Sequence, residues 1–144
     1  MTQMIFVNLP VADLTRSKAF YAALGFRNEP KFTNDMAAAM VLSDTITVML
    51  LTHDFWSTFT EKRRVDAKVE AQVLLCISRD DRDAVDAITE SAAKAGGRAD
   101  PCPAQDHGFM YGRSFEDPDG HIWEPMWMSA EAVEKGPMEI TDAG

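Results

Sequence analysis

Residues 108–124 read GFMYGRSFEDPDGHIWE, which predicts a strand, a tight turn and a second strand. Pro118 restricts φ to about −65° and Gly120 tolerates a positive φ, and tight turns use both properties. The aspartates on either side of Pro118 can accept hydrogen bonds from nearby backbone amides. We therefore expect a β-hairpin whose turn spans Glu116 to His121.

This turn determines which residues face each other across the hairpin. Antiparallel pairing places alternate residues on one side of the sheet, so partners can be counted outward from the turn. The expected pairs are Phe115 with Ile122, Arg113 with Glu124, and Tyr111 with Met126. In this register a guanidinium lies beside an inward carboxylate and keeps it ionised.

The composition fits a folded globular protein with an acidic surface. The chain has 144 residues, 46% of them hydrophobic, and a formal net charge of −9 at pH 7. Its only basic cluster, Lys62-Arg63-Arg64, is typical of a solvated loop. Phosphate backbones and anionic membranes attract basic patches, so we expect neither nucleic acid nor a membrane as a partner. Since the sequence shows neither a bilayer-spanning apolar run nor a signal peptide, we expect a cytoplasmic protein.

The first half of the chain predicts one strand, one helix and three further strands. The first strand is expected at 4–11 and the helix at 14–24, with Asp13 as its N-cap and Gly25 as its stop. Three extended segments are expected to follow, around Phe32, at 36–42 and at 45–52.

The second half predicts the same order of elements. We expect a strand at 70–78, a helix at 81–95, and a weak extended segment at 98–101 before the hairpin. The predicted organisation is a first βαβββ module at 1–60, a linker at 61–69, a second βαβββ module at 70–128 and a C-terminal tail at 129–144. Together these parts are expected to form one compact α+β domain.

Two tandem βαβββ units, the segment FYAALGF at Phe20 to Phe26 and the turn DPDG at Asp117 to Gly120 resemble the vicinal oxygen chelate superfamily. The resemblance covers residues 4 to about 128. This superfamily includes glyoxalase I, extradiol dioxygenases, metal-dependent fosfomycin-resistance enzymes and metal-free bleomycin-binding proteins. The resemblance implies a curved mixed sheet around a shared cleft, and frequently a homodimer.

The resemblance also indicates where a metal would bind. In that superfamily, residues on the first and last strand of each module hold the metal, and the matching positions here are Phe6, Met49, Gln72 and Glu124. Phenylalanine offers no donor atom and methionine only a soft thioether, whereas divalent cations need about three or more oxygen or nitrogen ligands. We therefore expect no metal cofactor. A divalent metal bound through other ligands is the alternative.

The inward face of the predicted sheets is apolar with a few polar groups. Alternation turns Trp123 and Trp127 towards the helices and the intervening side chains towards the cleft. The candidate ligand-binding residues share this inward position and are Phe6, Asn8, Met49, Gln72, Leu74, Tyr111, Arg113, Glu124 and Met126. Such a lining suits a small organic molecule as the ligand.

Three functions remain open from the sequence. The first is a metal-free protein of the bleomycin-resistance kind that binds a small organic molecule. The second is a lyase, isomerase or dioxygenase of the glyoxalase type, with or without a metal, in which Glu124 is the catalytic residue and acts as a general base. The third is a non-catalytic dimeric structural protein whose cleft is filled by side chains.

Overall fold

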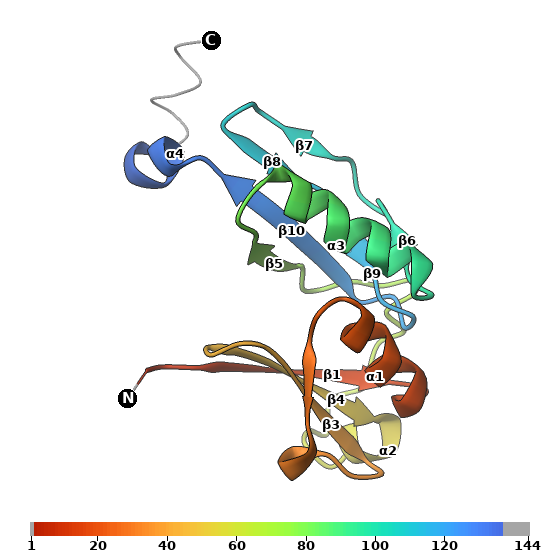
Figure 1. The fold of residues 1–144 in the computed structure, drawn as a ribbon. Helices are drawn as coiled ribbons and strands as arrows, with labels where there is room; N and C mark the ends of the chain where they lie inside the picture. The colour runs from red at the N-terminus through yellow and green to blue at the C-terminus, as the bar shows by residue number, and fades with distance from the viewer. Residues whose placement is uncertain (1, 137–144) are drawn as a thin grey trace. The chain divides into compact units, whose positions relative to one another are not determined.

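The computed structural model describes residues 2–136, and the chain divides into two compact units (Figure 1). Unit 1 comprises Met1–Ala71 and Asp117–His121, and unit 2 comprises Gln72–Glu116 and Ile122–Gly144. The turn Asp117–His121, which lies in the second repeat of the sequence, thus packs within unit 1. Part of the predicted tail, residues 137–144, lies outside the described residues.

Unit 1 is a four-stranded sheet with a helix packed on it. Its strand order is β1-β4-β3-β2, with β1 parallel to β4 and the other neighbours antiparallel. The elements are β1 (Ile5–Val11), α1 (Leu14–Ala23), β2 (Arg27–Glu29), the 3-10 helix η1 (Pro30–Phe32), β3 (Ala37–Ser43), β4 (Ile46–Thr52) and the short helix α2 (His53–Trp56).

The ends of α1 follow the local rules that the sequence indicates. The side chain of Asp13 caps the helix by accepting a hydrogen bond from the backbone amide of Arg16 at 3.0 Å. Gly25 follows the helix with a φ of +100°, which a residue with a side chain adopts only with strain. Both predictions for this helix are confirmed.

The extended segment predicted around Phe32 is wrong. The strand lies earlier, at β2, and Phe32 belongs to η1. Pro30 begins that helix, where its missing N–H costs nothing, and the carboxylate of Glu29 caps it by accepting from the amide of Lys31 at 3.3 Å.

Unit 2 is a mixed sheet built around its last strand, β10. Strands β9 and β8 pair with β10 in an antiparallel manner, one after the other, while β5 pairs with it in parallel. The elements are β5 (Leu75–Ser78), α3 (Arg82–Lys94), β6 (Arg98–Ala99), β7 (Gln105–Asp106), β8 (Met110–Gly112), β9 (Phe115–Glu116), β10 (Ile122–Met128) and α4 (Ala130–Lys135). The α+β fold with two βαβββ modules is therefore confirmed, with the penultimate strand of the second module interrupted between β8 and β9.

The strand predicted at 70–78 begins five residues later, at Leu75. Its partner β10 begins at Ile122, and the first pair in the ladder is Leu75 with Trp123. Residues 70–73 have no stretch of β10 beside them, so their backbone has no parallel partner there. None of the helices within residues 2–136 combines the length and the apolar character that crossing a bilayer requires.

The turn between β9 and β10 is organised by the buried carboxylate of Asp117, which is 3% exposed. One oxygen accepts hydrogen bonds from the backbone amides of Asp119 and His121, each at 2.9 Å, and the other accepts from the Tyr21 hydroxyl at 2.7 Å. Gly120 has a φ of +99°, and a Cβ there would lie 2.6 Å from the carbonyl oxygen of Ala67. Only glycine fits this position.

This turn contains one residue fewer than the hairpin expected from the sequence. Glu116 lies outside the turn and forms the first strand pair beyond it, with Ile122. Phe115 consequently pairs with Trp123, not with Ile122. Because side chains alternate, a shift of one residue moves every side chain of the preceding strand to the other face of the sheet.

We predict that the Asp117→Asn variant gains stability relative to the natural protein as pH rises. Burial raises the pKa of the Asp117 carboxyl above its ordinary value of 3.8. A raised folded-state pKa contributes stability that is complete below the unfolded value and lost as pH rises through the folded value. The uncharged amide has no such loss, so the difference in the free energy of unfolding should shift towards the variant between about pH 4 and pH 7.

Urea denaturation at several pH values measures this difference. The exposed Asp35, changed to Asn, serves as the matched control and should show no such trend. A difference between Asp117→Asn and the natural protein that is constant across this pH range would contradict the prediction.

Candidate functional site

Unit 1 brings three of the predicted ligand-binding residues onto one face of its sheet. Phe6 and Asn8 project from β1 on the side opposite Leu9 and Val11, which are buried. In the parallel ladder, Asn8 lies beside Met49 of β4. Paired residues of neighbouring strands point to the same side, so an aromatic ring, an amide and a thioether share this face.

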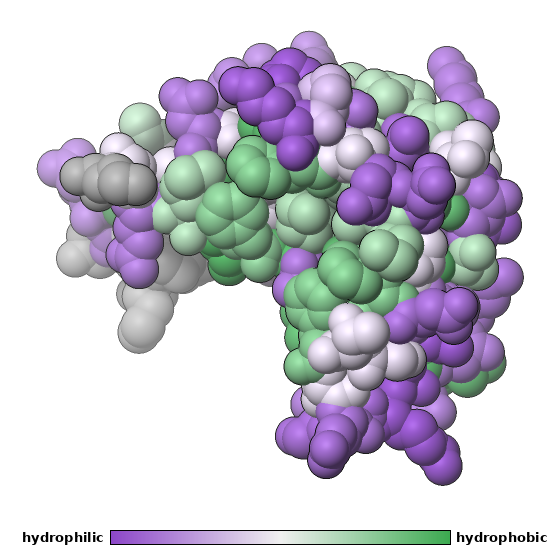
Figure 2. Space-filling model, turned by 90° about the horizontal axis from the view of Figure 1, so that it is seen from below, coloured by the Kyte–Doolittle hydropathy of each residue, from purple (hydrophilic) through white to green (hydrophobic). Residues whose placement is uncertain are grey.

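The face around Phe6 is apolar and partly open. The Phe6 side chain is 57% exposed, which is unusual for a large apolar group on a strand. Its direct partner on β4 is the buried Thr47. The other residues that share its face on β3 and β4 are small or apolar, namely Ala37, Ala39, Val41, Met49 and Leu51, and of these Ala37, Ala39 and Leu51 are buried. Figure 2 shows, on the side of the molecule that it draws, apolar side chains gathered in patches with polar side chains at their borders.

In unit 2, Glu124 and Met126 lie on one face of β10, and Trp123 and Pro125 lie on the other, where both are buried. The burial of Trp123 beneath α3 confirms that it points towards the helix, as alternation predicts. Sequence reasoning missed Cys76, which lies beside Glu124 in the parallel ladder between β5 and β10. Alternation along the predicted strand, which places Cys76 on the same face as Gln72 and Leu74, is the signal that could have found it.

Glu124 has no hydrogen bond or ion pair from any other side chain within residues 2–136. Partial burial, and then the negative charge of Glu124, raise the pKa of the Cys76 thiol. A thiol with a raised pKa stays protonated at neutral pH and is a poor nucleophile. Glu116 shares this face through its pairing with Ile122, but it lies 3.7 Å from the Arg98 guanidinium, whereas Glu124 has no such cation among residues 2–136.

The predicted pair of Arg113 with Glu124 is wrong. Arg113 lies opposite Pro125, and its backbone amide donates to the Pro125 carbonyl at 3.2 Å. The shifted register turns the side chains of Arg113 and Tyr111 to the face covered by α3, away from Glu124. Both residues were expected to contact a ligand together with Glu124, and the structure does not bring them together with it.

Two more predicted residues, Gln72 and Leu74, lie before β5 and not within it. Both are exposed, and the Leu74 side chain is 51% exposed. Of the nine residues in the predicted set, the structure groups Phe6 with Asn8 and Met49 in unit 1, and Glu124 with Met126 in unit 2.

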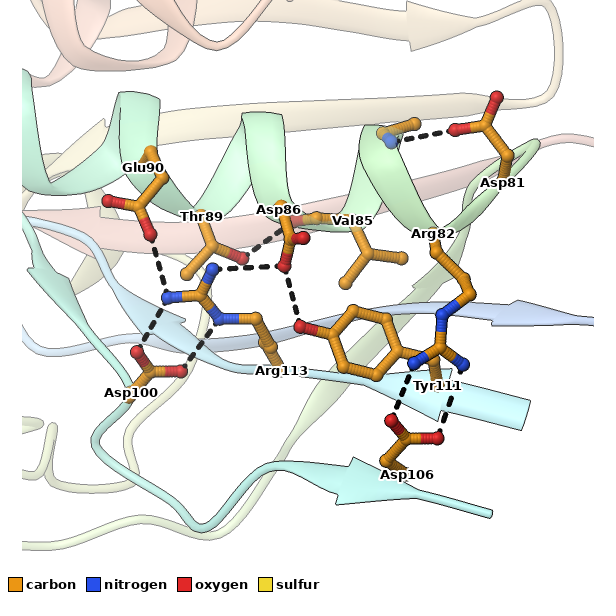
Figure 3. A network of polar contacts seen from close by, with 11 residues as sticks. Asp81, Arg82, Val85, Asp86, Thr89, Glu90, Asp100, Asp106, Tyr111 and Arg113 are labelled. Atoms are coloured by element: carbon orange, nitrogen blue, oxygen red, sulfur yellow. Dashed lines mark hydrogen bonds and ion pairs between the residues drawn. The ribbon is translucent and has the colours of Figure 1, made fainter. Parts of the chain in front are cut away.

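Arg113 is the centre of an ion-pair network between β8, β9 and α3 (Figure 3). Its guanidinium binds Asp100 through two hydrogen bonds of 3.0 and 2.7 Å, Asp86 at 3.1 Å and Glu90 at 2.9 Å. The Arg113 side chain is 14% exposed, so these contacts are only partly screened by water. The carboxylates raise the pKa of Arg113, and the hydrogen bond from Arg113 lowers the pKa of Asp100.

The helix contributes to this network through residues spaced four apart, Arg82, Asp86 and Glu90, which lie on one face of α3. The Tyr111 hydroxyl donates to Asp86 at 2.6 Å and lowers the pKa of that carboxyl. The Arg82 guanidinium stacks over the Tyr111 ring at 4.3 Å and forms an ion pair with Asp106. These contacts attach the β7–β8 hairpin to α3 (Figure 3). The guanidinium groups of Arg82 and Arg113 both take part in them.

The residues at the superfamily's metal positions do not fit a metal ion. In unit 1 the two positions carry the ring of Phe6 and the thioether of Met49, neither of which binds hard or borderline divalent cations well. In unit 2, Glu124 is beside a protonated thiol, and Gln72 lies outside the strand. Among residues 2–136 no group of three or more His, Cys, Asp or Glu side chains is arranged to hold a metal.

Comparison with solved structures shows which class of fold this is. A hypothetical protein, SA1046 from S. aureus, is 24% identical with a TM-score of 0.73 over 88% of this chain and 94% of its own. A glyoxalase/bleomycin resistance protein/dioxygenase family enzyme from Burkholderia phytofirmans PsJN is 18% identical with a TM-score of 0.70 over 88% and 99%. The fosfomycin resistance protein FosX from Mesorhizobium loti is 17% identical with a TM-score of 0.62 over 93% and 96%. The chain has the fold that these proteins share.

Sequence comparison adds a family to this fold. Residues 3–42 match the family described as bleomycin resistance protein-like N-terminal, a segment that contains Phe6 and Asn8. No curated protein matches the chain. The chain thus resembles the glyoxalase/bleomycin resistance/dioxygenase proteins, known also as the vicinal oxygen chelate superfamily, in its fold and in this N-terminal segment.

We predict that Arg113→Ala lowers the free energy of unfolding by about 1–3 kcal/mol, because it leaves three carboxylates close together without their shared cation. The exposed Arg98, whose guanidinium lies 3.7 Å from Glu116, is the matched control. Its change to Ala should cost no more than about 0.5 kcal/mol. Urea denaturation at low salt measures both values, and equal losses in the two variants would contradict the assignment.

Proposed function

We propose that this glyoxalase/bleomycin-resistance-like protein binds a small organic molecule directly, without a metal ion. Two groups of the predicted residues support this, each within its own unit: Phe6, Asn8 and Met49 share a face in unit 1, and Glu124 and Met126 share a face in unit 2. The observation that supports this most strongly is the exposed ring of Phe6 on an apolar strand face, at a position where the superfamily's metal-binding members need a ligand atom. Covering a ring of this size contributes about 1.5–3 kcal/mol.

The unpaired negative charge of Glu124 favours a ligand with a cationic group over an anionic one. The cation expected beside Glu124 was Arg113, which carboxylates hold under α3, and Glu124 is left as an unpaired carboxylate among residues 2–136. A partly buried carboxylate is stabilised by a cation or by hydrogen-bond donors. The ligand proposed is therefore an aromatic or amphipathic molecule that carries an ammonium or similar donor group.

The family match agrees with this proposal, because the matched residues 3–42 include β1 with Phe6 and Asn8. The homodimer and the cytoplasmic location expected from the sequence stay predictions. Light scattering coupled to size-exclusion chromatography measures the first of these directly.

We predict that 2-naphthylmethylammonium binds the protein more tightly than 2-naphthoate, since the two probes share a ring system and differ in charge. A chelator should leave both affinities unchanged, because no metal takes part. Glu124→Gln should reduce the preference for the ammonium probe. Phe6→Ala should weaken both probes about tenfold, through the loss of about 1.4 kcal/mol of apolar contact.

Isothermal titration with and without EDTA measures these affinities. The matched control is Phe32→Ala, which removes another exposed ring, 68% exposed, from η1 and should change neither affinity. Saturable binding of neither probe, or binding that EDTA abolishes, would contradict the proposal. The second of these results would favour a metal-dependent enzyme of the glyoxalase type.

A further inference from the structure

The turn Asp117–His121 is fastened to the end of β1, the strand that carries Phe6 and Asn8. The Asp119 carboxylate accepts a hydrogen bond from the backbone amide of Ala12 at 2.9 Å. The His121 ring nitrogen Nε2 lies 2.8 Å from the Pro10 carbonyl oxygen, and it donates there because a carbonyl only accepts. The last residues of β1 are thus held from outside their own sheet.

Asp119 makes these contacts from a position that is nearly buried, with its side chain 10% exposed. Its second oxygen accepts from the Ser17 hydroxyl at 3.3 Å, and the Arg16 guanidinium lies 3.7 Å from the first. Ala12 connects β1 to α1, and its amide has no partner from either element. The carboxylate of Asp119 satisfies this amide with a charge-assisted hydrogen bond.

Hydrogen bonds and close packing fix the conformation of the turn itself. The Asp117 carboxylate binds two of its amides, the Tyr21 hydroxyl holds that carboxylate, and Gly120 packs directly against the backbone at Ala67. No part of this arrangement involves the faces that carry Phe6, Asn8 or Glu124. The turn therefore has no direct role in contacting a ligand there.

The turn is followed directly by β10, the strand that carries Glu124. His121 is followed at once by Ile122, the first residue of β10, and Glu124 is two residues further on. One turn thus binds the end of β1 by hydrogen bonds and is covalently joined to the start of β10.

We propose that Asp119 and His121 are positioning residues for β1: they hold the end of the strand that carries Phe6 and Asn8 without touching the ligand. The part of this inference that concerns ligand affinity rests on the function proposed above. The part that concerns how well β1 is ordered does not depend on it.

The test compares two pairs of variants in the full chain. Asp119→Ala removes the acceptor for Ala12, and Asp119→Asn restores an oxygen acceptor without the charge. His121→Ala and His121→Gln form the same kind of pair, because the glutamine amide can donate to the Pro10 carbonyl. Arg16→Ala is the matched control, since it removes only the 3.7 Å ion pair to Asp119.

Hydrogen exchange, followed by mass spectrometry, measures how well the backbone of these strands is ordered, and it needs no ligand. In Asp119→Ala we expect about tenfold faster exchange for the amides of residues 5–12, with a smaller increase at 122–126. Asp119→Asn should return exchange close to that of the natural protein, and Arg16→Ala should not alter it. Unchanged exchange at 5–12 in Asp119→Ala, or a uniform increase over the whole chain, would overturn the proposal.

Titration with 2-naphthylmethylammonium measures the effect on binding. Asp119→Ala and His121→Ala should weaken the probe at least fivefold, and Asp119→Asn and His121→Gln should restore most of the affinity. Arg113→Ala removes contacts with Asp86, Glu90 and Asp100 and none with Glu124, so it should destabilise unit 2 and leave the affinity unchanged. Equal weakening by Arg113→Ala would show that lost stability, not lost positioning, is responsible. If the natural protein binds no probe, the proposed function fails, and hydrogen exchange still decides whether the turn orders β1.

Discussion

The buried carboxylate of Asp117 determines how the hairpin of the second repeat is built. It accepts hydrogen bonds from the amides of Asp119 and His121 and from the Tyr21 hydroxyl, so the turn closes within Asp117–His121. Glu116 then pairs with Ile122, and the register of β9 and β8 against β10 follows from this shorter turn. The register in turn decides which side chains of β8 face α3 and which face the open side of the sheet.

This register places the charged groups of unit 2 on two faces of the sheet, where they have different roles. Arg113 and Tyr111 lie under α3, where carboxylates at four-residue spacing bind them and attach the hairpin to the helix. Glu124 lies on the other face, with an apolar neighbour in Met126 and a protonated thiol in Cys76. The arginine that could have neutralised Glu124 stabilises the fold in this arrangement, and the carboxylate stays available to a ligand.

Much of the fold could be predicted because it depends on local chemistry. The cap at Asp13, the stop at Gly25, the repeated order of elements and the direction of Trp123 all follow from neighbours in the sequence. The register of the hairpin could not be predicted, because it depends on Tyr21, which lies 96 positions from Asp117. A candidate site defined by strand pairing inherits that error, which is why Arg113 and Tyr111 were grouped with Glu124. Alternation with Gln72 and Leu74 predicts the face of Cys76, but its neighbour Glu124 depends on the pairing of parallel strands, which leaves no turn from which to count.

The central functional claim is that Phe6 and Met49 leave this protein without the ligands that a divalent cation needs. The most direct measurement is the metal content of protein purified without chelators, by elemental mass spectrometry, for the natural chain and for Glu124→Gln. The account predicts far less than one equivalent of any divalent metal per chain, and the same small amount in both proteins. One equivalent of metal in the natural protein that is lost in Glu124→Gln would contradict it.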